Sequence, residues 1–240
     1  MEKEKFYREM KNKGEEIGID FSVEQLWKTY RYMELLIEWN QKINLTAITE
    51  PKEIIQKHFI DSLTINKNIK NAKKVVDIGT GAGFPGVPLG IMNEKTEMFL
   101  VDSLNKRIIF LEEVVKELNL KNITLIHARA EDFGKKEEYR EKFDIAVSRA
   151  VANLSTLSEY LVPLVKIGGK VISMKASDAS EEINNAKKAI NVLGGAIENV
   201  EEFTLPESDI GRTIVTIRKE RCTPSRYPRK AGLPSKEPIK

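Results

Sequence analysis

One short stretch constrains the fold of this chain more than any other: the apolar segment 75–78 (VVDI) runs directly into residues 79–83 (GTGAG). A short apolar run that ends in glycines is typical of a buried strand followed by a ligand-binding turn. Glycine permits tight turns, and it lets the backbone approach a ligand closely. The stretch therefore predicts a β-strand, a glycine loop and a helix, in that order.

Strand-like and helix-like segments alternate from about residue 72 to residue 219. Ser103 is predicted to cap a helix that extends to about Leu118, and a second helix is expected over 178–193. This alternation predicts a mainly parallel sheet with helices on both faces. The further predicted strands are 98–101, 123–127, 143–147, 169–174, 197–205 and 213–218.

The first 70 residues have a helical pattern instead. Ser22 and Gln25 form a capping-box pattern, and the apolar residues that follow recur at helical spacing. A second helix is predicted after Thr49, with Pro51 in its first turn. We therefore expect a helical extension over 1–70, an α/β domain over 71–219 and a separate arm over 220–240.

Composition excludes several classes of protein. Hydrophobic residues make up 41% of the 240-residue chain, enough for a buried core, and no apolar run reaches the length of a membrane span. The charged N-terminus lacks the apolar stretch of a secretory signal. Cys222, His58 and His127 are too few for a zinc site. We expect a cytoplasmic protein without a metal or a membrane segment, and nothing in the sequence demands more than a monomer.

Basic residues gather at the C-terminus. Residues 218–240 carry eight basic and two acidic side chains, a net charge of +6, so the other 217 residues sum to −3. The same region is rich in proline and has no apolar periodicity, so it is expected to be an extended arm that becomes ordered on a partner. A basic segment on a near-neutral chain is a candidate contact for a polyanion. The alternative is a solvated end that binds nothing.

The pattern of the glycine loop discriminates between nucleotide ligands. A dinucleotide fingerprint needs Gly-x-Gly-x-x-Gly, and its third position here is Phe84. Pro85 also lacks the N–H group that a phosphate would need. Asp77 followed by glycines at 79, 81 and 83 is instead the form typical of methyltransferases that use S-adenosylmethionine. A nicotinamide oxidoreductase is therefore disfavoured.

Two further positions fit the same cofactor. Asp102 ends the predicted strand 98–101, 21 residues after Gly81, where a carboxylate can accept hydrogen bonds from ribose hydroxyls. Residues 128–132 follow the next strand and can reach the adenine edge. Each feature also has a simpler reading, a turn without a ligand or an acidic helix cap. Their order along one sheet favours a cofactor site.

At this point the chain resembles a known family, the bacterial guanine-N7 methyltransferases of small-subunit ribosomal RNA, also called glucose-inhibited division protein B. The resemblance covers nearly the whole chain. The two N-terminal stretches and the C-terminal stretch are more specific than the cofactor loop, which many methyltransferases share. The matching stretches are DIGTGAGFPG (77–86), VDSLNKR (101–107), RAED (129–132), SRAVA (148–152), WNQKINLT (39–46), HFIDSL (58–63) and YPRKAGLPSK (227–236).

The resemblance implies a class I S-adenosylmethionine-dependent methyltransferase fold, Rossmann-like, behind the helical extension. It also implies methyl transfer to guanine N7 in 16S rRNA of the small ribosomal subunit. With RNA as the substrate, the candidate contacts to its phosphates are Arg226, Arg229, Lys230 and Lys236. By the same resemblance, the residues that contact S-adenosylmethionine would be Asp77, Gly79, Gly81 and Phe84 in the loop, Asp102 and Ser103 beside the ribose, Ala130 and Glu131 beside the adenine, and Arg149 at the mouth of the site.

The chemistry of guanine N7 explains why the sequence needs no residue that acts as a general base. N7 carries an in-plane lone pair and no proton, so it can attack an activated methyl group without a general base. We expect Arg149 and Lys175 to position the substrate, because each ends a predicted strand on the same side of the sheet. The alternatives are an ion pair between Arg149 and a helix residue, and a surface role for Lys175.

Two other functions remain open on the sequence alone. One is a methyltransferase that acts on a small molecule, which would have little use for a basic arm. The other is a non-catalytic assembly factor of the ribosome that binds S-adenosylmethionine without turnover. If the arm serves only RNA, removal of residues 222–240 is expected to weaken RNA binding and to leave cofactor binding intact.

Overall fold

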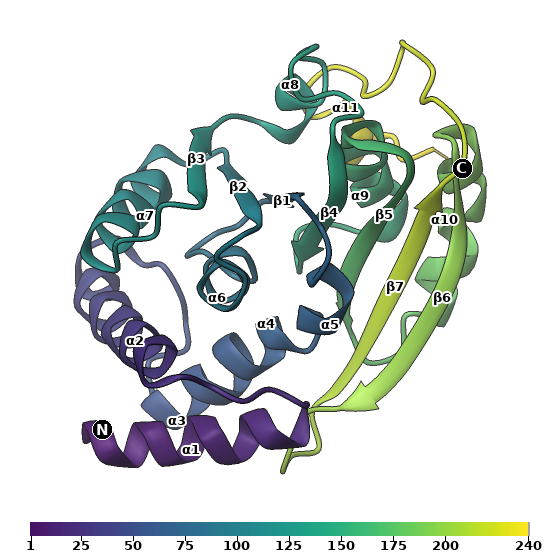
Figure 1. Ribbon diagram of the computed structural model, residues 1–240. Helices are drawn as coiled ribbons and strands as arrows, with labels where there is room; N and C mark the ends of the chain where they lie inside the picture. The colour runs from purple at the N-terminus through teal and green to yellow at the C-terminus, as the bar shows by residue number, and fades with distance from the viewer. Residues whose placement is uncertain (240) are drawn as a thin grey trace.

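The computed structural model describes residues 1–239, and its centre is a seven-stranded sheet with the order β3-β2-β1-β4-β5-β7-β6 (Figure 1). Strands β1 to β5 pair in parallel, and β7 is antiparallel to both of its neighbours. The predicted mainly parallel sheet is therefore confirmed. The strands are β1 (Lys74–Ile78), β2 (Glu97–Asp102), β3 (Ile123–His127), β4 (Phe143–Arg149), β5 (Val165–Ala176), β6 (Gly195–Thr204) and β7 (Gly211–Lys219).

The strand order reverses between β1 and β4, because the chain builds the sheet outward through β2 and β3 and then returns to the other side of β1. Open α/β sheets bind ligands at such a switch point, outside the carboxyl ends of the strands. Asp102 ends β2 and Arg149 ends β4. The topology therefore brings these two predicted site residues to the same edge of the sheet as the glycine loop.

Helices cover both faces of the sheet, as predicted. On one face lie α6 (Gly86–Met92) and α7 (Asn105–Glu117), and on the other lie α8 (Ala130–Phe133), α9 (Leu154–Leu161) and α10 (Ser180–Val192). Successive side chains of a strand point to opposite faces. Val75 therefore joins the core beneath α6 and α7, while Val76 joins the core beneath α9 and α10.

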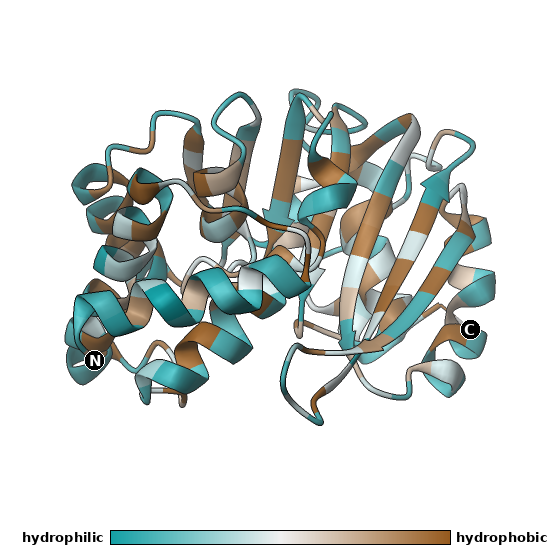
Figure 2. Cartoon of the chain, turned by 60° about the horizontal axis from the view of Figure 1, so that its bottom comes forward, coloured by the Kyte–Doolittle hydropathy of each residue, from teal (hydrophilic) through white to brown (hydrophobic). Residues whose placement is uncertain are grey.

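The N-terminal extension, residues 1–70, packs on the α6–α7 face. It consists of α1 (Lys3–Glu16), α2 (Val23–Ile43), α3 (Pro51–Ile54), a π-helical turn (Ile55–Ile60), α4 (Asp61–Leu63) and α5 (Asn66–Ile69). Ser22 and Gln25 form the predicted capping box at the start of α2. In Figure 2 the helix that begins at the N-terminus is mostly hydrophilic, in keeping with the few apolar residues, such as Phe6 and Met10, that it buries.

Ser103 does not cap α7, so that prediction is wrong. The helix begins at Asn105, and its N-cap residue Leu104 has no side-chain cap. The carboxylate of Asp102 accepts the Leu104 N–H instead, at 2.9 Å. A carboxylate can satisfy a free N–H group at a helix start as well as a serine hydroxyl can. Asp102 therefore caps the start of α7 in place of Ser103.

The C-terminal segment, residues 220–239, is not an extended arm, so that expectation is wrong as well. It runs over α8 and α9 and includes the short helix α11 (Leu233–Lys236) (Figure 1). Tyr227 and Pro234 are buried. The segment lacks apolar periodicity because polar contacts hold it, chiefly those of Arg229 and Arg140. Within residues 1–239 no helix is both long and apolar enough to cross a membrane.

Candidate functional site

Two neighbouring cavities open at the carboxyl ends of β1, β2 and β4. The first cavity, of about 390 Å³, also takes residues from the N-terminal extension, and the second cavity, of about 360 Å³, takes residues from α8 and the C-terminal segment. Gly79, Asp102, Ser103 and Val151 line both cavities. The predicted cofactor loop therefore lies where the two cavities meet.

The glycine loop adopts a backbone that only glycine accepts easily. Gly79 has φ +70° and Gly81 has φ +63°, both in the left-handed region. A Cβ atom added to Gly79 would lie 2.6 Å from Cγ2 of Val151, closer than packed carbon atoms approach. Val151 belongs to the loop after β4, so this glycine lets the two loops lie against each other between the cavities.

Asp77 lies beneath the loop and is fully buried. Its Oδ2 accepts hydrogen bonds from the Thr80 hydroxyl at 2.7 Å and from the Gly86 N–H at 2.9 Å. Its Oδ1 has no partner among the described residues. Burial raises the pKa of this carboxyl to about 6, although the two hydrogen bonds oppose the shift. Asp77 therefore acts on the loop from below, because it ties both ends of the turn together.

Asp102 lies between the two cavities and is only 2% exposed. Its carboxylate accepts the Gly81 N–H at 2.9 Å and pairs with the Arg107 guanidinium at 3.1 Å, besides the contact to Leu104. Sequence reasoning missed Arg107, although it stands five residues after Asp102 in the matched motif. Nη1 of Arg107 also lies 3.5 Å from the other carboxylate oxygen. These contacts fix the carboxylate against the glycine loop, where it lines both cavities.

Ala130 and Glu131 begin α8 and line the second cavity. Glu131 is 4% exposed, and its Oε1 accepts the backbone N–H of Gly232 at 2.7 Å. Gly232 and Ser235 also line this cavity. The C-terminal segment thus supplies part of the wall, which the sequence pattern did not indicate.

Phe84 follows the glycine loop and stacks on residues of the N-terminal extension. Its ring centroid lies 4.5 Å from that of His58 and 5.2 Å from that of Tyr32, with nearly parallel planes. The guanidinium carbon of Arg149 lies 5.4 Å from the Phe84 ring centroid. An aromatic ring at this position therefore joins the cofactor loop to the extension, which a glycine there could not do.

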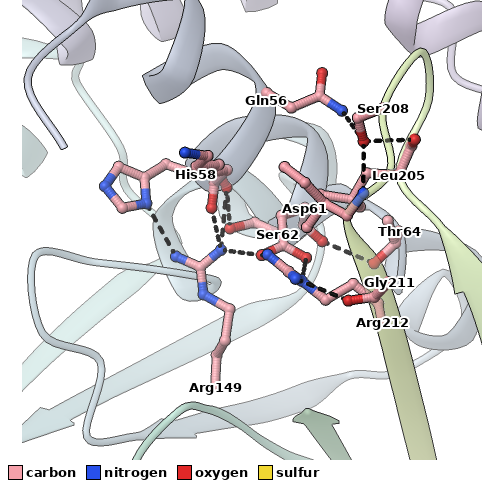
Figure 3. A network of polar contacts seen from close by, with 12 residues as sticks. Gln56, His58, Asp61, Ser62, Thr64, Arg149, Leu205, Ser208, Gly211 and Arg212 are labelled. Carbon is pink, nitrogen blue, oxygen red and sulfur yellow. Dashed lines mark hydrogen bonds and ion pairs between the residues drawn. The ribbon is translucent and has the colours of Figure 1, made fainter. Parts of the chain in front are cut away.

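Arg149 lines the first cavity, and residues of the N-terminal extension hold its guanidinium (Figure 3). Its guanidinium donates to the Lys57 carbonyl at 3.0 Å and pairs with Asp61 at 3.0 Å. Arg212 of β7 pairs with the same carboxylate at 2.9 Å. The structure thus contains the ion pair with a helix residue that was the alternative reading of Arg149. Only part of the guanidinium is left to face a ligand, since the side chain is 14% exposed.

His58 lies between Arg149 and Thr46 in the first cavity. Its Nδ1 lies 3.4 Å from Nη2 of Arg149, and a guanidinium can only donate, so Nδ1 is the acceptor. The hydrogen is then on Nε2, which donates to the Thr46 hydroxyl at 2.9 Å. Burial, and secondarily the Arg149 charge, lower the pKa of His58 to about 4. The imidazole is therefore neutral at neutral pH.

Lys175 does not line either cavity. Its side chain is 9% exposed, and its ammonium group donates to Glu182 and to the Ala152 carbonyl, both at 2.6 Å. It therefore holds the loop after β4 against α10. Of the predicted RNA contacts, Arg226, Lys230 and Lys236 are exposed, whereas Arg229 pairs with the buried carboxylate of Glu159.

A larger cavity of about 780 Å³ lies away from the glycine loop, at the start of α10. Its charged lining residues are all acidic, namely Asp178, Glu181 and Glu182. It has no glycine turn, and it shares no residue with the two cavities at the carboxyl ends of β1, β2 and β4. Volume alone therefore does not make it the functional site.

Comparison with known proteins decides the family. A family model described as rRNA small subunit methyltransferase G matches residues 25–210. The proteins named ribosomal RNA small subunit methyltransferase G of Desulforamulus reducens and of Clostridium tetani are 53% and 49% identical to the chain. The first alignment covers 96% of the chain and 97% of the relative, and the second covers 98% and 100%. The chain belongs to this family. The resemblance expected from the sequence is thereby confirmed, as is the class of enzyme, an S-adenosylmethionine-dependent methyltransferase.

Solved structures of low identity agree on the fold of this methyltransferase. The TYW2 protein of M. jannaschii, solved in complex with AdoMet, has a TM-score of 0.52 at 15% identity, covering 66% of this chain and 76% of that one. The precorrin-6y C5,15-methyltransferase of Geobacter metallireducens has a TM-score of 0.51 at 13% identity, covering 74% and 92%. The predicted class I methyltransferase fold is confirmed.

The residues of this family member fit S-adenosylmethionine. Gly79 and Gly81 both line the first cavity with bare backbone, so no side chain of the loop occupies the space beside them. The second cavity combines the small residues Ala128 and Ala130 with the carboxylate of Glu131, and Asp102 stands between the cavities. A flat adenine and a polar ribose match this lining.

Proposed function

We propose that the chain transfers a methyl group from S-adenosylmethionine to N7 of a guanine in 16S rRNA of the small ribosomal subunit. The relatives' name, rRNA small subunit methyltransferase G, supports rRNA as the substrate class. The observation that carries the proposal is the pair of cavities that meet at Gly79 and Asp102, at the switch point of the sheet. We further propose that it works in the cytoplasm as a monomer.

The two cavities suggest how the cofactor is divided. The second cavity would hold adenine beside Ala130 and Glu131, and Asp102 with Ser103 would hold the ribose. The first cavity would hold the methionine end beside the glycine loop and Phe84, with room for the target base. When bound, the cofactor supplies a methyl group on a positively charged sulfur, which is a good leaving group.

The remaining task of the protein is alignment and exclusion of water. Guanine N7 has a free lone pair, so no residue needs to remove a proton. His58, the titratable ring at this cavity, is neutral because its pKa is lowered to about 4. Holding nucleophile and electrophile in line can contribute roughly 7–11 kcal/mol to a reaction of this kind. Arg149 and His58, fixed by Asp61 and Thr46, would form the rigid wall that sets this alignment.

The exposed basic residues of the C-terminal segment would contact RNA phosphates. Arg226, Lys230 and Lys236 are free to do so, because their charged groups lie at the surface. Arg229 forms an ion pair with Glu159, so we propose that it holds the segment in place and that its neighbours bind the phosphates. Lys175, paired with Glu182, is likewise proposed to position the loop after β4.

Transfer of labelled methyl groups tests the proposal. The protein is incubated with labelled S-adenosylmethionine and either small ribosomal subunits from a strain that lacks the enzyme or an extract of small metabolites. Label in the RNA of the subunits is expected. Label only in the extract would favour the small-molecule methyltransferase, and cofactor binding without any transfer would favour the assembly factor.

A further inference from the structure

The C-terminal segment has an inner side that faces the second cavity. Gly232 and Ser235 line this cavity together with Ala130, Glu131 and Asp102. The Gly232 N–H donates to Oε1 of Glu131 at 2.7 Å. Gly232 has φ +81°, which turns its N–H group toward α8 at no steric cost. A segment some 100 residues away in sequence from Glu131 therefore sets the position of that carboxylate.

Buried contacts hold the segment in this place. Oε2 of Glu159 lies 2.6 Å from Nη2 of Arg229, and Oε1 accepts the Arg229 backbone N–H at 2.7 Å. Glu159 is 0% exposed, whereas the Arg229 side chain is 23% exposed, so it is the buried carboxylate that depends on the pair for its counter-charge. The Thr156 hydroxyl donates to the Pro234 carbonyl at 3.0 Å. Helix α9 therefore anchors the segment on both sides of Gly232.

A second anchor lies nearer the start of the segment. The guanidinium of Arg140 donates to the carbonyl of Tyr227 at 2.7 Å and to that of Thr223 at 2.8 Å. These acceptors are backbone atoms, so the contact fixes the path of the chain and needs no particular side chain there. The segment reaches the cavity along one defined path.

The free atom of Glu131 points to a ligand. No donor among residues 1–239 reaches Oε2 of Glu131, and this oxygen is not one of the fully buried atoms without a partner, so it is accessible at the cavity that Glu131 lines. A carboxylate oxygen at a cavity wall can accept a hydrogen bond, and the amino group of adenine or a ribose hydroxyl is a donor of the right kind. The Gly232 N–H occupies one oxygen and leaves the other for the cofactor.

We propose that residues 229–236 are a cofactor-binding element, which closes the adenine side of the site and positions Glu131. The proposal rests on the proposed function, since it takes S-adenosylmethionine as the ligand of the second cavity. It also links the two ligands of the enzyme. Lys230 and Lys236, at the surface of the same segment, would contact RNA, so RNA that stabilises the segment in this place also favours cofactor binding.

Calorimetry with S-adenosylhomocysteine on the full-length chain tests the proposal. Ser235→Trp places a large ring at the cavity wall, and Glu237→Trp places the same ring two residues away, outside the lining. We expect the first variant to bind at least about tenfold more weakly and the second to bind within about twofold of the unaltered chain. Both positions are exposed, so both variants are expected to fold.

A second pair of variants tests the anchor. Arg229→Gln removes the ion pair with Glu159, whereas Arg221→Gln removes an exposed contact to Asn191 at the start of the segment. Only Arg229→Gln is expected to weaken S-adenosylhomocysteine binding, by about tenfold. Affinity unchanged in both Ser235→Trp and Arg229→Gln would overturn this proposal alone. A lack of binding by the unaltered chain would overturn the proposed function with it.

Discussion

The Arg149 guanidinium, at the end of β4, lies 3.0 Å from a carboxylate oxygen of Asp61 in the N-terminal extension. Arg212 of β7 binds the same carboxylate at 2.9 Å, and Asp61 is only 2% exposed. One buried acidic residue therefore joins the extension to two strands of the sheet. Through Arg149 it also fixes the inner wall of the first cavity, so the extension is part of the site and not a cover added to it.

Asp61→Asn tests that relationship. It keeps the shape of the side chain but leaves two arginines without their counter-charge, and removing one partner of a buried pair costs about 3–5 kcal/mol. Chemical denaturation should show a loss of that size in the free energy of unfolding. Glu38→Gln, which breaks the exposed pair with Lys42, is the control and should leave the unfolding midpoint in place. An equal change in the free energy of unfolding for both variants would contradict a stabilising role for the pairing of Asp61 with Arg149 and Arg212.

Gly79→Ala tests the contact between the two loops. The added Cβ would lie 2.6 Å from Val151, and the backbone has φ +70°, which alone costs roughly 1–2 kcal/mol for other residues. We expect weaker binding of S-adenosylhomocysteine by calorimetry. Adding Val151→Ala should recover part of the loss, because it removes the clash and leaves only the backbone strain. A double variant as weak as Gly79→Ala would show that Val151 does not matter.

The pH dependence of stability tests the environment of His58. Burial lowers its pKa from 6.5 to about 4, so between these values the unfolded chain binds the proton and the folded chain does not. The stability that depends on a neutral His58 is fully present above pH 6.5. It is lost as the pH falls to about 4, which lowers the free energy of unfolding by roughly 3 kcal/mol. His58→Gln should lack this loss. A common slope for both proteins in this range would contradict the burial of a neutral imidazole.

Asp77 changes the stability with pH in the opposite direction to His58, over nearly the same pH range. Its pKa is raised from 3.8 to about 6, so the folded chain holds the proton more tightly and loses stability as the pH rises through 6. Asp77→Asn should remove that loss and leave a protein that gains stability steadily from pH 4 to pH 6.5, driven by His58. Denaturation curves at several pH values measure this. Identical curves for Asp77→Asn and the unaltered chain would contradict the prediction.

Salt dependence tests the RNA contacts. Each phosphate contact to single-stranded RNA adds about 0.7 to the slope of log affinity against log salt. Lys230→Ala and Lys236→Ala should each reduce the slope for small-subunit RNA by about that amount. Lys11→Ala, at an exposed lysine of α1, is the control, because Figure 1 shows α1 at the bottom of the molecule and the C-terminal segment at the top. If Lys11→Ala lowered the slope by the same amount, the attraction of RNA would depend on the overall charge of the protein and not on these two lysines.

Much of the site follows from local sequence. The glycine loop and Asp102 could be predicted because strand, turn and helix signals stand next to one another in the chain, and the parallel topology then brings strand ends together. The residue that caps α7 could not be predicted, because either Ser103 or Asp102 can accept a free N–H group at the start of this helix. The choice depends on the packing of Asp102 against Gly81, which is a tertiary contact.

The C-terminal segment shows where such reasoning ends. Its prolines and charges are typical of an unpacked arm, and its anchors, Arg140 and Glu159, stand 87 and 70 residues before the atoms that they hold. Periodicity reports only apolar packing, and this segment is held by an ion pair and by bonds to carbonyl groups. Arg149 and Asp61, 88 residues apart, are paired in the same way beyond the reach of local patterns.

Mass spectrometry of nucleosides tests the central claim most directly. Small ribosomal subunits from a strain without the enzyme are treated with the protein and S-adenosylmethionine, and their RNA is digested and compared with an untreated sample. The account predicts one new 7-methylguanosine per 16S rRNA molecule. A methyl group on another atom or another base, or no new methylated nucleoside despite cofactor binding, would contradict it.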